Sequence, residues 1–163
     1  MSTIDDFVAA NADYAQNFHQ PGLATAPKRK LVVVTCMDSR LDVFAMLGLE
    51  LGEAHIVRNA GGVVTDDVIR SLIISQRKLD TEEIALVHHT RCGGLTFRDD
   101  DLKDEIEGET GIRPAFAMEA FTDLDQSVRQ SMGRIETNPF LSHRRVRGFV
   151  YDVDSGLLRE ITR

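Results

Sequence analysis

Residues 31–40 read Leu-Val-Val-Val-Thr-Cys-Met-Asp-Ser-Arg. The first five form a continuous apolar and β-branched run, which is typical of a parallel strand buried on both faces. The next five bring a thiol, a carboxylate and a guanidinium group. In open α/β sheets, binding sites lie beyond the carboxyl ends of the strands. The stretch therefore predicts an α/β fold with a functional site just after Thr35.

A second apolar run, Ile84–His88, precedes the segment His89-Thr-Arg-Cys92. This run also reads as a buried strand, and the two segments together hold both cysteines of the chain. If the two strands are neighbours in a parallel sheet, their carboxyl ends lie at one edge of it. The pattern therefore predicts that two thiols and one imidazole meet at that edge.

The rest of the sequence alternates strands with helices, which is typical of a mostly parallel α/β sheet flanked by helices. Apolar periodicity, caps and turn residues predict helices over 3–18, 41–47, 66–79, 99–109 and 124–136. Strands are predicted over 31–35, 54–58, 84–88 and 146–153, with a C-terminal antiparallel strand over 157–161. At 163 residues, the chain is expected to form one domain over 1–163.

Composition excludes several classes of protein. The net charge of −7 argues against nucleic acid as a partner, because phosphate binding requires a basic surface. The sequence has no run of about 18 apolar residues, so we expect no transmembrane helix and no membrane partner. Residues 1–11 lack the basic segment and apolar core of a secretory signal. Two cysteines without such a signal predict a reducing, cytoplasmic location.

The donor set predicts a zinc site, with one ion per chain bound by Cys36, His89 and Cys92. Cysteine sulfur and histidine nitrogen are common zinc ligands, and three protein ligands leave a fourth position open, as in catalytic sites. Taken singly, each residue has a simpler explanation as a buried core cysteine or a satisfied strand-end histidine. The three together favour the metal. We expect His88 to point to the other face of its strand, as a packing residue or a support for the ligands.

Asp38 and Arg40 follow Cys36 closely and can form a charge-assisted pair. Three roles stay open from the residues alone. The pair is a structural ion pair; or Asp38 orients the water at the metal while Arg40 keeps Asp38 ionised; or Asp38 turns in as a fourth ligand and closes the site. Two thiolates cancel the formal charge of Zn²⁺, so the site acidifies water less than three histidines would. Activity is therefore expected to favour higher pH.

An acidic run in the second half of the chain admits two interpretations. Its carboxylates are of a type that calcium prefers, but the run lacks the glycine and the spacing of a calcium-binding loop. We interpret it as the solvated face of a helix. The residues are Asp99, Asp100, Asp101, Asp104 and Glu105.

Three segments, in this order, resemble the β-class carbonic anhydrases, and most closely their short prokaryotic branch. They are Cys36-Met-Asp-Ser-Arg40, Arg58-Asn-Ala-Gly61 and His89-Thr-Arg-Cys-Gly93. The resemblance covers nearly the whole chain, and the motif set is highly specific. It departs at two positions. Arg91 stands where many members have an acidic residue, and Gly62 stands where Asn is frequent. Arg91 either raises local anion affinity or points to solvent, and we favour solvent.

The resemblance implies roles for individual residues. Cys36, His89 and Cys92 are the zinc ligands, and Asp38 with Arg40 is the catalytic pair. The implied substrate-binding residue is Gly93, whose backbone N–H donates to bound substrate or bicarbonate. A homodimer or a higher homo-oligomer is also implied, with the N-terminal helix, about 3–18, packing on a partner subunit.

The function implied by the resemblance is the lyase reaction of a carbonate dehydratase, the reversible hydration of carbon dioxide to bicarbonate and a proton. The sequence does not assign the proton acceptor, and His55, His88 and buffer are candidates. Two alternatives stay open. One is hydrolysis of carbonyl sulfide or carbon disulfide on the same scaffold. The other is a noncatalytic zinc protein in which Asp38 completes the coordination.

Overall fold

The computed structural model describes residues 3–162, and within that range five strands form one sheet. In spatial order the strands run β2, β1, β3, β4, β5; the first four are parallel, and β5 is antiparallel to β4. The strands are β1 (Leu31–Cys36), β2 (Ala54–Asn59), β3 (Glu83–His89), β4 (Val146–Tyr151) and β5 (Leu158–Ile161). The predicted fold class is confirmed.

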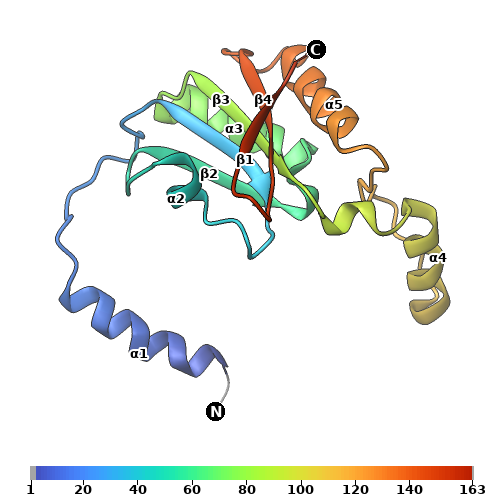
Figure 1. Ribbon diagram of the computed structural model, residues 1–163, viewed down its shortest axis with the longest axis horizontal. Coiled ribbons are helices and arrows are strands. Elements are labelled where there is room, and N and C mark those ends of the chain that lie inside the picture. The colour runs from blue at the N-terminus through green and yellow to red at the C-terminus, as the bar shows by residue number, and fades with distance from the viewer. Residues whose placement is uncertain (1–2, 163) are drawn as a thin grey trace.

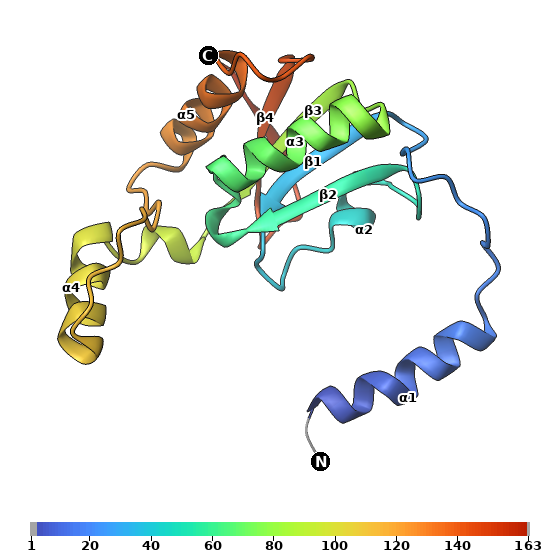
Figure 2. The ribbon, with the colours of Figure 1, turned by 180° about the vertical axis from the view of Figure 1, so that it is seen from behind.

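Five α-helices accompany the sheet in the described part of the chain. They are α1 (Thr3–Gln16), α2 (Val43–Leu47), α3 (Asp66–Leu79), α4 (Asp99–Thr110) and α5 (Leu124–Glu136). Helices α3 and α5 lie over one face of the sheet and α2 over the other, whereas α1 and α4 stand away from it (Figure 1 and Figure 2). No helix within residues 3–162 has the length and apolar character needed to cross a membrane.

The strands bury apolar side chains on both faces, which is why β1 reads as a continuous apolar run. Val32 and Val34 belong to the cluster under α3 and α5, whereas Val33 belongs to a smaller cluster beside α2. All three side chains are fully buried. This alternation follows from the two-residue period of a strand. The sheet is therefore the central layer of the molecule.

Helix α3 has the predicted bounds, 66–79, and a cap at each end. The Thr65 hydroxyl accepts a hydrogen bond from the Val68 N–H at 3.4 Å, as an N-cap does. At the other end Asp80 adopts a left-handed conformation, with φ +60°, and stops the helix. Val68 and Leu72 are buried against the sheet. These two residues therefore form part of the inner face of the helix.

Three predicted boundaries differ from the structure by two residues each. Helix α1 ends earlier than predicted. Helix α2 begins later, because Asp42 caps it by accepting a hydrogen bond from the Ala45 N–H at 3.2 Å. Strand β4 ends earlier, because the chain turns at Asp152, whose N–H donates to the Leu157 carbonyl at 2.8 Å. In each case a local turn overrides the apolar pattern.

The two strands that carry the motifs are neighbours, which is the condition that the sequence analysis set for a shared site. Thr35 of β1 lies opposite Val87 of β3, and its hydroxyl donates to the Val87 carbonyl at 2.7 Å. Cys36 is the last residue of β1 and His89 is the last residue of β3. Because the strands are parallel and in register, both residues reach the same edge of the sheet.

Candidate metal centre

Cys36, His89 and Cys92 come together at the carboxyl edge of the sheet. One donor atom from each lies within 4.8 Å of the others, and the two sulfur atoms are 4.0 Å apart. Two thiolates at about 2.3 Å from one tetrahedral ion would lie about 3.8 Å from each other. The residues are buried, with 4%, 0% and 2% of their surface exposed. The donors therefore fit one tetrahedral metal ion.

The imidazole of His89 is oriented for metal binding. Its Nδ1–H donates to the Thr90 carbonyl at 2.9 Å, which fixes the tautomer and leaves Nε2 as an acceptor. Nε2 is buried and has no hydrogen-bond partner among the described residues. An unsatisfied buried acceptor destabilises the fold by about 1–3 kcal/mol. A metal ion at Nε2 removes that penalty, so this atom is the strongest single indication of the site.

The two thiols influence each other's ionisation. The hydrogen bond between them lowers the pKa of Cys36, whereas the same contact raises the pKa of Cys92. The contact therefore favours ionisation of the Cys36 thiol. Thiolate is the form that coordinates metal.

Asp38 and Arg40 form the pair that the sequence indicated. The guanidinium group donates from Nε to Oδ1 at 2.9 Å and from Nη2 to Oδ2 at 2.7 Å. These hydrogen bonds hold the pKa of Asp38 well below its usual range. Oδ2 lies 3.7 Å from Nε2 of His89, so the carboxylate stands beside the donor atoms. The pair can therefore present a fixed anionic acceptor to a water molecule at the centre.

A cavity of about 350 Å³ opens beside the donors. Its walls include Cys36, Asp38 and Cys92, together with Gly93 and Phe97. The Gly93 predicted to bind substrate thus lines the same space as the predicted ligands Cys36 and Cys92. A small cavity with mainly carbon walls and a few polar groups at one end is suited to a small, uncharged substrate.

A family model described as carbonic anhydrase matches residues 31–158 of this chain. The chain belongs to the β-carbonic anhydrase family. It is 56% identical over 163 residues to β-carbonic anhydrase 1 of Mycobacterium tuberculosis, a match that covers 99% of each chain. A crystal structure of carbonic anhydrase from Streptococcus mutans has a TM-score of 0.93 and 42% identity, with 99% of both chains covered.

A more distant relative carries a different name. A carbon disulfide hydrolase of Acidithiobacillus thiooxidans is 31% identical, over 80% of this chain and 76% of its own. The predicted resemblance to the β-carbonic anhydrases is confirmed by the family model, by sequence identity and by the fold.

Arg58 has a positioning role in this β-carbonic anhydrase that the sequence did not indicate. Its guanidinium group donates to the backbone carbonyls of Cys36 at 2.8 Å, Asp38 at 2.6 Å and Leu41 at 3.3 Å. These bonds fix the loop that carries both a predicted ligand and the predicted catalytic carboxylate. Arg58 stood in a recognised motif, but its partners are backbone atoms, which leave no trace in a sequence.

The two departures from the family pattern have structural explanations in this enzyme. Gly62 has a φ of +69°, and a Cβ atom there would come within 2.9 Å of the Cys36 backbone nitrogen. Asn tolerates the left-handed region, but only glycine avoids this collision. The side chain of Arg91 is 61% exposed and pairs with Asp154 in the β4–β5 turn. Its backbone carbonyl accepts a hydrogen bond from Nη2 of Arg40 at 3.0 Å.

Neither of the two histidines considered as proton acceptors lines the cavity beside the donors. His88 is fully buried; its Nε2 pairs with the Gly62 carbonyl at 3.1 Å, and burial lowers its pKa to about 4. His55 lies near the start of β2, at the opposite edge of the sheet, and its Nδ1 pairs with the Ser75 hydroxyl at 2.8 Å. Of the candidates from the sequence, buffer is the one that the geometry leaves.

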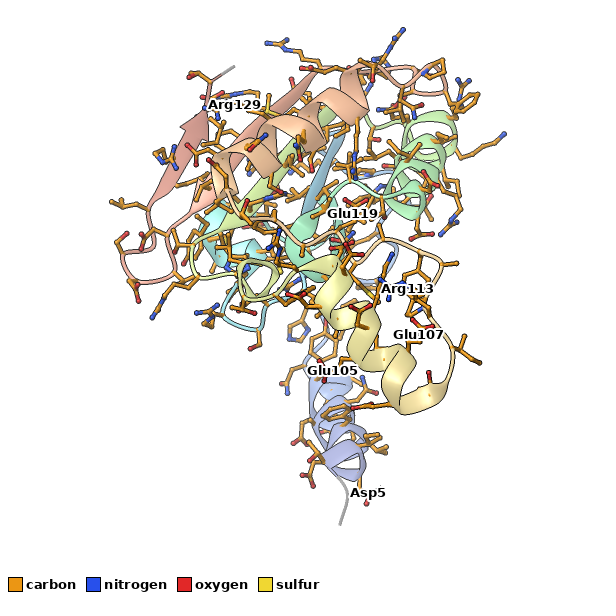
Figure 3. The ribbon with its side chains drawn as sticks, turned by 90° about the vertical axis from the view of Figure 1, so that its right-hand side faces the viewer. Asp5, Glu105, Glu107, Arg113, Glu119 and Arg129 are labelled. Atoms are coloured by element: carbon orange, nitrogen blue, oxygen red, sulfur yellow. The ribbon has the colours of Figure 1, made fainter. Side chains whose placement is uncertain are left out.

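The acidic run is the exposed side of helix α4, as the sequence analysis favoured. Arg113 follows the helix and forms ion pairs with Asp100, Asp104 and Glu107. Figure 3 shows Arg113 and Glu107 beside this helix. Among residues 3–162, the group of His, Cys, Asp and Glu donors close enough to hold a metal is Cys36, His89 and Cys92. Within this run, Asp100, Asp101, Asp104 and Glu105 are exposed and act as surface charges, whereas Asp99 is partly buried.

Proposed function

We propose that this chain catalyses the reversible hydration of carbon dioxide to bicarbonate and a proton, with one zinc ion held by Cys36, His89 and Cys92. One observation carries the proposal: two buried sulfurs and an unpartnered imidazole nitrogen lie within 4.8 Å of one another. Soft sulfur ligands with imidazole favour zinc over harder cations such as magnesium. Membership in the carbonic anhydrase family makes the chain a lyase.

The residues around the metal donors have separate roles in the proposed reaction. When bound, zinc supplies a Lewis acid that makes water nucleophilic near neutral pH. Asp38 orients the attacking water by accepting its hydrogen bond at Oδ2, and Arg40 keeps that carboxylate ionised and fixed. Attack of the water oxygen on the carbon of carbon dioxide forms one C–O bond while one C=O π bond breaks and its electron pair moves to the oxygen of that C=O group. An O–H proton of the water leaves to buffer. The backbone N–H of Gly93, which lines the cavity, donates to an oxygen of bicarbonate.

The alternative functions are less well supported. Hydrolysis of carbon disulfide rests on relatives such as the carbon disulfide hydrolase of Acidithiobacillus thiooxidans, which is 31% identical over 80% of this chain, compared with 56% over 99% for the mycobacterial β-carbonic anhydrase. The noncatalytic reading needs Asp38 to become a fourth ligand. Its two carboxylate oxygens are instead engaged by Arg40, and turning inward would break both side-chain bonds.

Two further parts of the proposal concern the whole protein. We place the enzyme in the cytoplasm, on the argument from its two reduced cysteines. We also place helix α1 on a second copy of the chain, in a homodimer or a higher homo-oligomer. The support for this is that α1 has no buried residue in the single chain.

The first experiment is stopped-flow hydration of carbon dioxide from pH about 6.5 to 9, with zinc measured in the same sample. We expect one zinc per chain and a rate that rises with pH. Cys36→Ser should lose zinc and activity together, because a hydroxyl is a poor zinc ligand. Ser39→Ala is the matched control, since Ser39 is exposed in the same loop. One zinc per chain with no hydration would contradict carbon dioxide as the substrate. One zinc per chain in Cys36→Ser would contradict Cys36 as a zinc ligand.

A further inference from the structure

The segment Met118–Phe121, here named the strap, forms one wall of the cavity beside the metal donors. Met118 and Glu119 line that cavity together with Cys36 and Cys92. The strap lies between α4 and α5; each of its residues is described, and none belongs to a helix or a strand. Its position is therefore set by contacts with other parts of the chain rather than by regular backbone pairing.

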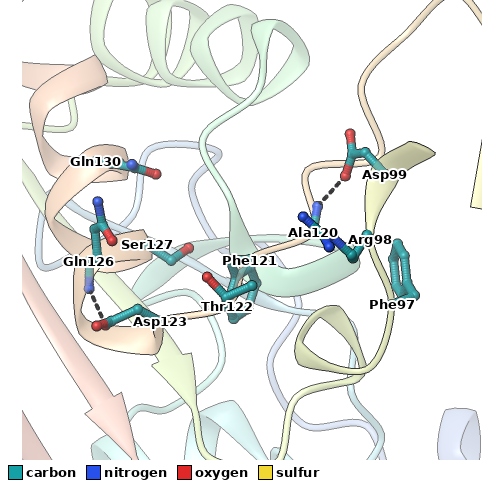
Figure 4. A pocket seen from close by; sticks show the side chains of 10 residues that line it. All are labelled: Phe97, Arg98, Asp99, Ala120, Phe121, Thr122, Asp123, Gln126, Ser127 and Gln130. Carbon is teal, nitrogen blue, oxygen red and sulfur yellow. Dashed lines mark hydrogen bonds between the residues drawn. The ribbon is translucent and has the colours of Figure 1, made fainter. Parts of the chain in front are cut away.

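The carboxylate of Asp99, in the first turn of α4, accepts hydrogen bonds from consecutive backbone N–H groups of the strap. Oδ2 accepts from Met118 at 2.8 Å and from Glu119 at 3.2 Å, and Oδ1 accepts from Ala120 at 2.8 Å. Figure 4 shows the bond to Ala120. Burial raises the pKa of Asp99, but the three N–H groups outweigh it and lower this pKa below its usual value. Asp99 is therefore ionised at neutral pH. Its three hydrogen bonds with the strap are here named the clasp.

The strap backbone is shaped to receive an anion. Glu119 has a φ of +61°, in the left-handed region that a residue with a Cβ atom seldom adopts. Successive N–H groups around such a residue converge on one point and form an anion-binding concavity. Asp99 fills this concavity. It therefore stabilises a backbone conformation that is unfavourable without it.

Other contacts hold the strap at its end and through its side chains. Glu119 forms a bidentate ion pair with Arg134 of α5, at 2.9 and 3.0 Å. The Phe121 N–H donates to the Gly94 carbonyl at 3.0 Å, and its ring packs against His88 with centroids 5.8 Å apart. None of these described contacts uses the N–H groups that Asp99 binds. Removing the charge of Asp99 should therefore loosen the strap without detaching it.

We propose that Asp99 is a positioning residue for the reaction: by holding the strap, it sets the shape of the cavity in which the substrate meets the metal donors. Asp99 does not itself line the cavity, so it acts through Met118 and Glu119. The identity of the substrate rests on the proposed function above, whereas the clasp does not depend on it. Loss of the clasp should affect access and binding of substrate more than the chemical step.

The test compares Asp99→Asn with Asp100→Asn in the zinc-loaded enzyme. Both variants remove one negative charge from the first turn of α4, but Asp100 pairs with Arg113 and not with the strap. Amide hydrogen exchange, followed by NMR, should accelerate at least about tenfold at 118–120 in Asp99→Asn, since bonds to a charged acceptor are lost. KM for carbon dioxide should rise several-fold. We expect kcat, zinc content and the midpoint of the pH profile to stay near wild type.

A second variant keeps the charge and covers a failure of Asp99→Asn to fold. Asp99→Glu moves the carboxylate outward by one methylene, and it should give exchange rates and KM between those of the wild type and Asp99→Asn. Unchanged exchange at 118–120 in both variants would overturn the clasp. Faster exchange with an unchanged KM would overturn its role in the reaction. Wild-type enzyme that does not hydrate carbon dioxide would instead overturn the proposed function, while the exchange data would still decide the clasp.

Discussion

The carboxylate of Asp38 receives hydrogen bonds from the backbone N–H and from two guanidinium nitrogens of Arg40. At the scale of single residues, this arrangement bears on the role of Asp38. A carboxylate held by a bidentate arginine is fixed in direction, and Oδ2 lies 3.7 Å from Nε2 of His89. The geometry supports an orienting role, in which Asp38 accepts a hydrogen bond from water at the metal without binding the metal itself.

We expect Asp38→Asn to retain one zinc per chain and to lower kcat by about 100-fold or more, the range typical for a positioned proton-accepting group. The amide cannot accept hydrogen bonds at both atoms. Zinc analysis and stopped-flow hydration on one sample measure both quantities. Asp80→Asn is the control, because Asp80 is an exposed carboxylate paired with Lys30 at the opposite edge of the sheet. Loss of zinc in Asp38→Asn would make Asp38 a ligand instead.

The lowered pKa of Asp99 makes a prediction about stability and pH. In the unfolded chain its pKa returns to about 3.8. A depressed pKa stabilises the native state above that value, and the stabilisation is lost as pH falls through the native pKa. Urea unfolding of the wild type and Asp99→Asn should differ by about 1–3 kcal/mol at pH 7. The difference should shrink below pH about 4. A difference that stays constant down to pH about 3 would show that the charge of Asp99 is not what stabilises the strap.

At the scale of elements, the contact between α5 and β4 depends on one glycine. Gly148 lies in β4 beneath α5. A Cβ atom at this position would come within 2.5 Å of both Val128 and Met132, which α5 buries against the sheet. The absent side chain is what allows the helix to approach the strand closely. Part of the core is thus determined by a residue that contributes no apolar surface.

We expect Gly148→Ala to lower the free energy of unfolding by about 1–3 kcal/mol, the range for overpacking a filled core. Urea unfolding at fixed protein concentration measures it. Gly108→Ala is the matched control, because Gly108 lies within α4 with no atom near its missing Cβ. There alanine should stabilise the chain slightly, by about 0.5–1 kcal/mol. Equal stability of the two variants would contradict the close packing of α5 on β4.

At the scale of the whole molecule, helix α1 stands apart from the sheet in both Figure 1 and Figure 2. Phe7, Val8 and Tyr14 are 62%, 76% and 57% exposed. Their helical spacing places them on one face, whereas Ala9 and Asp13 lie on the opposite face. An isolated helix of this length is marginally stable in water. An apolar face on such a helix is best explained by packing on a second copy of the chain.

We expect Phe7→Glu to reduce the mass measured by sedimentation equilibrium from that of the proposed homo-oligomer to that of a smaller species. A buried charge in the interface is strongly destabilising. Ala9→Glu adds the same charge to the opposite face and should leave the mass unchanged. Deleting residues 1–18 should have the same effect as Phe7→Glu while keeping the circular dichroism of the sheet. An unchanged mass in both Phe7→Glu and the deletion would exclude α1 from the interface.

The sequence by itself determined where the helices and strands form and which side chains are suited to bind a metal. The β-branched run of β1 could be buried on both faces only as a central strand. Thr65 caps the start of α3, and Gly48, in a left-handed conformation, caps the end of α2. Both ends could be predicted because caps act within a few residues. The two segments with Cys36, His89 and Cys92 indicated the metal, and together with Arg58–Gly61 they indicated the family. These features depend on local backbone preferences and on ligand chemistry, both of which residue identity fixes.

The tertiary structure decided everything that depends on distance through space. Only the order of the strands shows that β1 and β3 are adjacent, and hence that Cys36 and Cys92 lie 4.0 Å apart. Arg58 and Asp99 bind backbone atoms of remote loops, and backbone atoms are the same in every sequence. Gly62 is required by the backbone of a strand 26 positions earlier, at Cys36. Such contacts leave no periodic pattern and no motif in the sequence, so only the folded structure shows them.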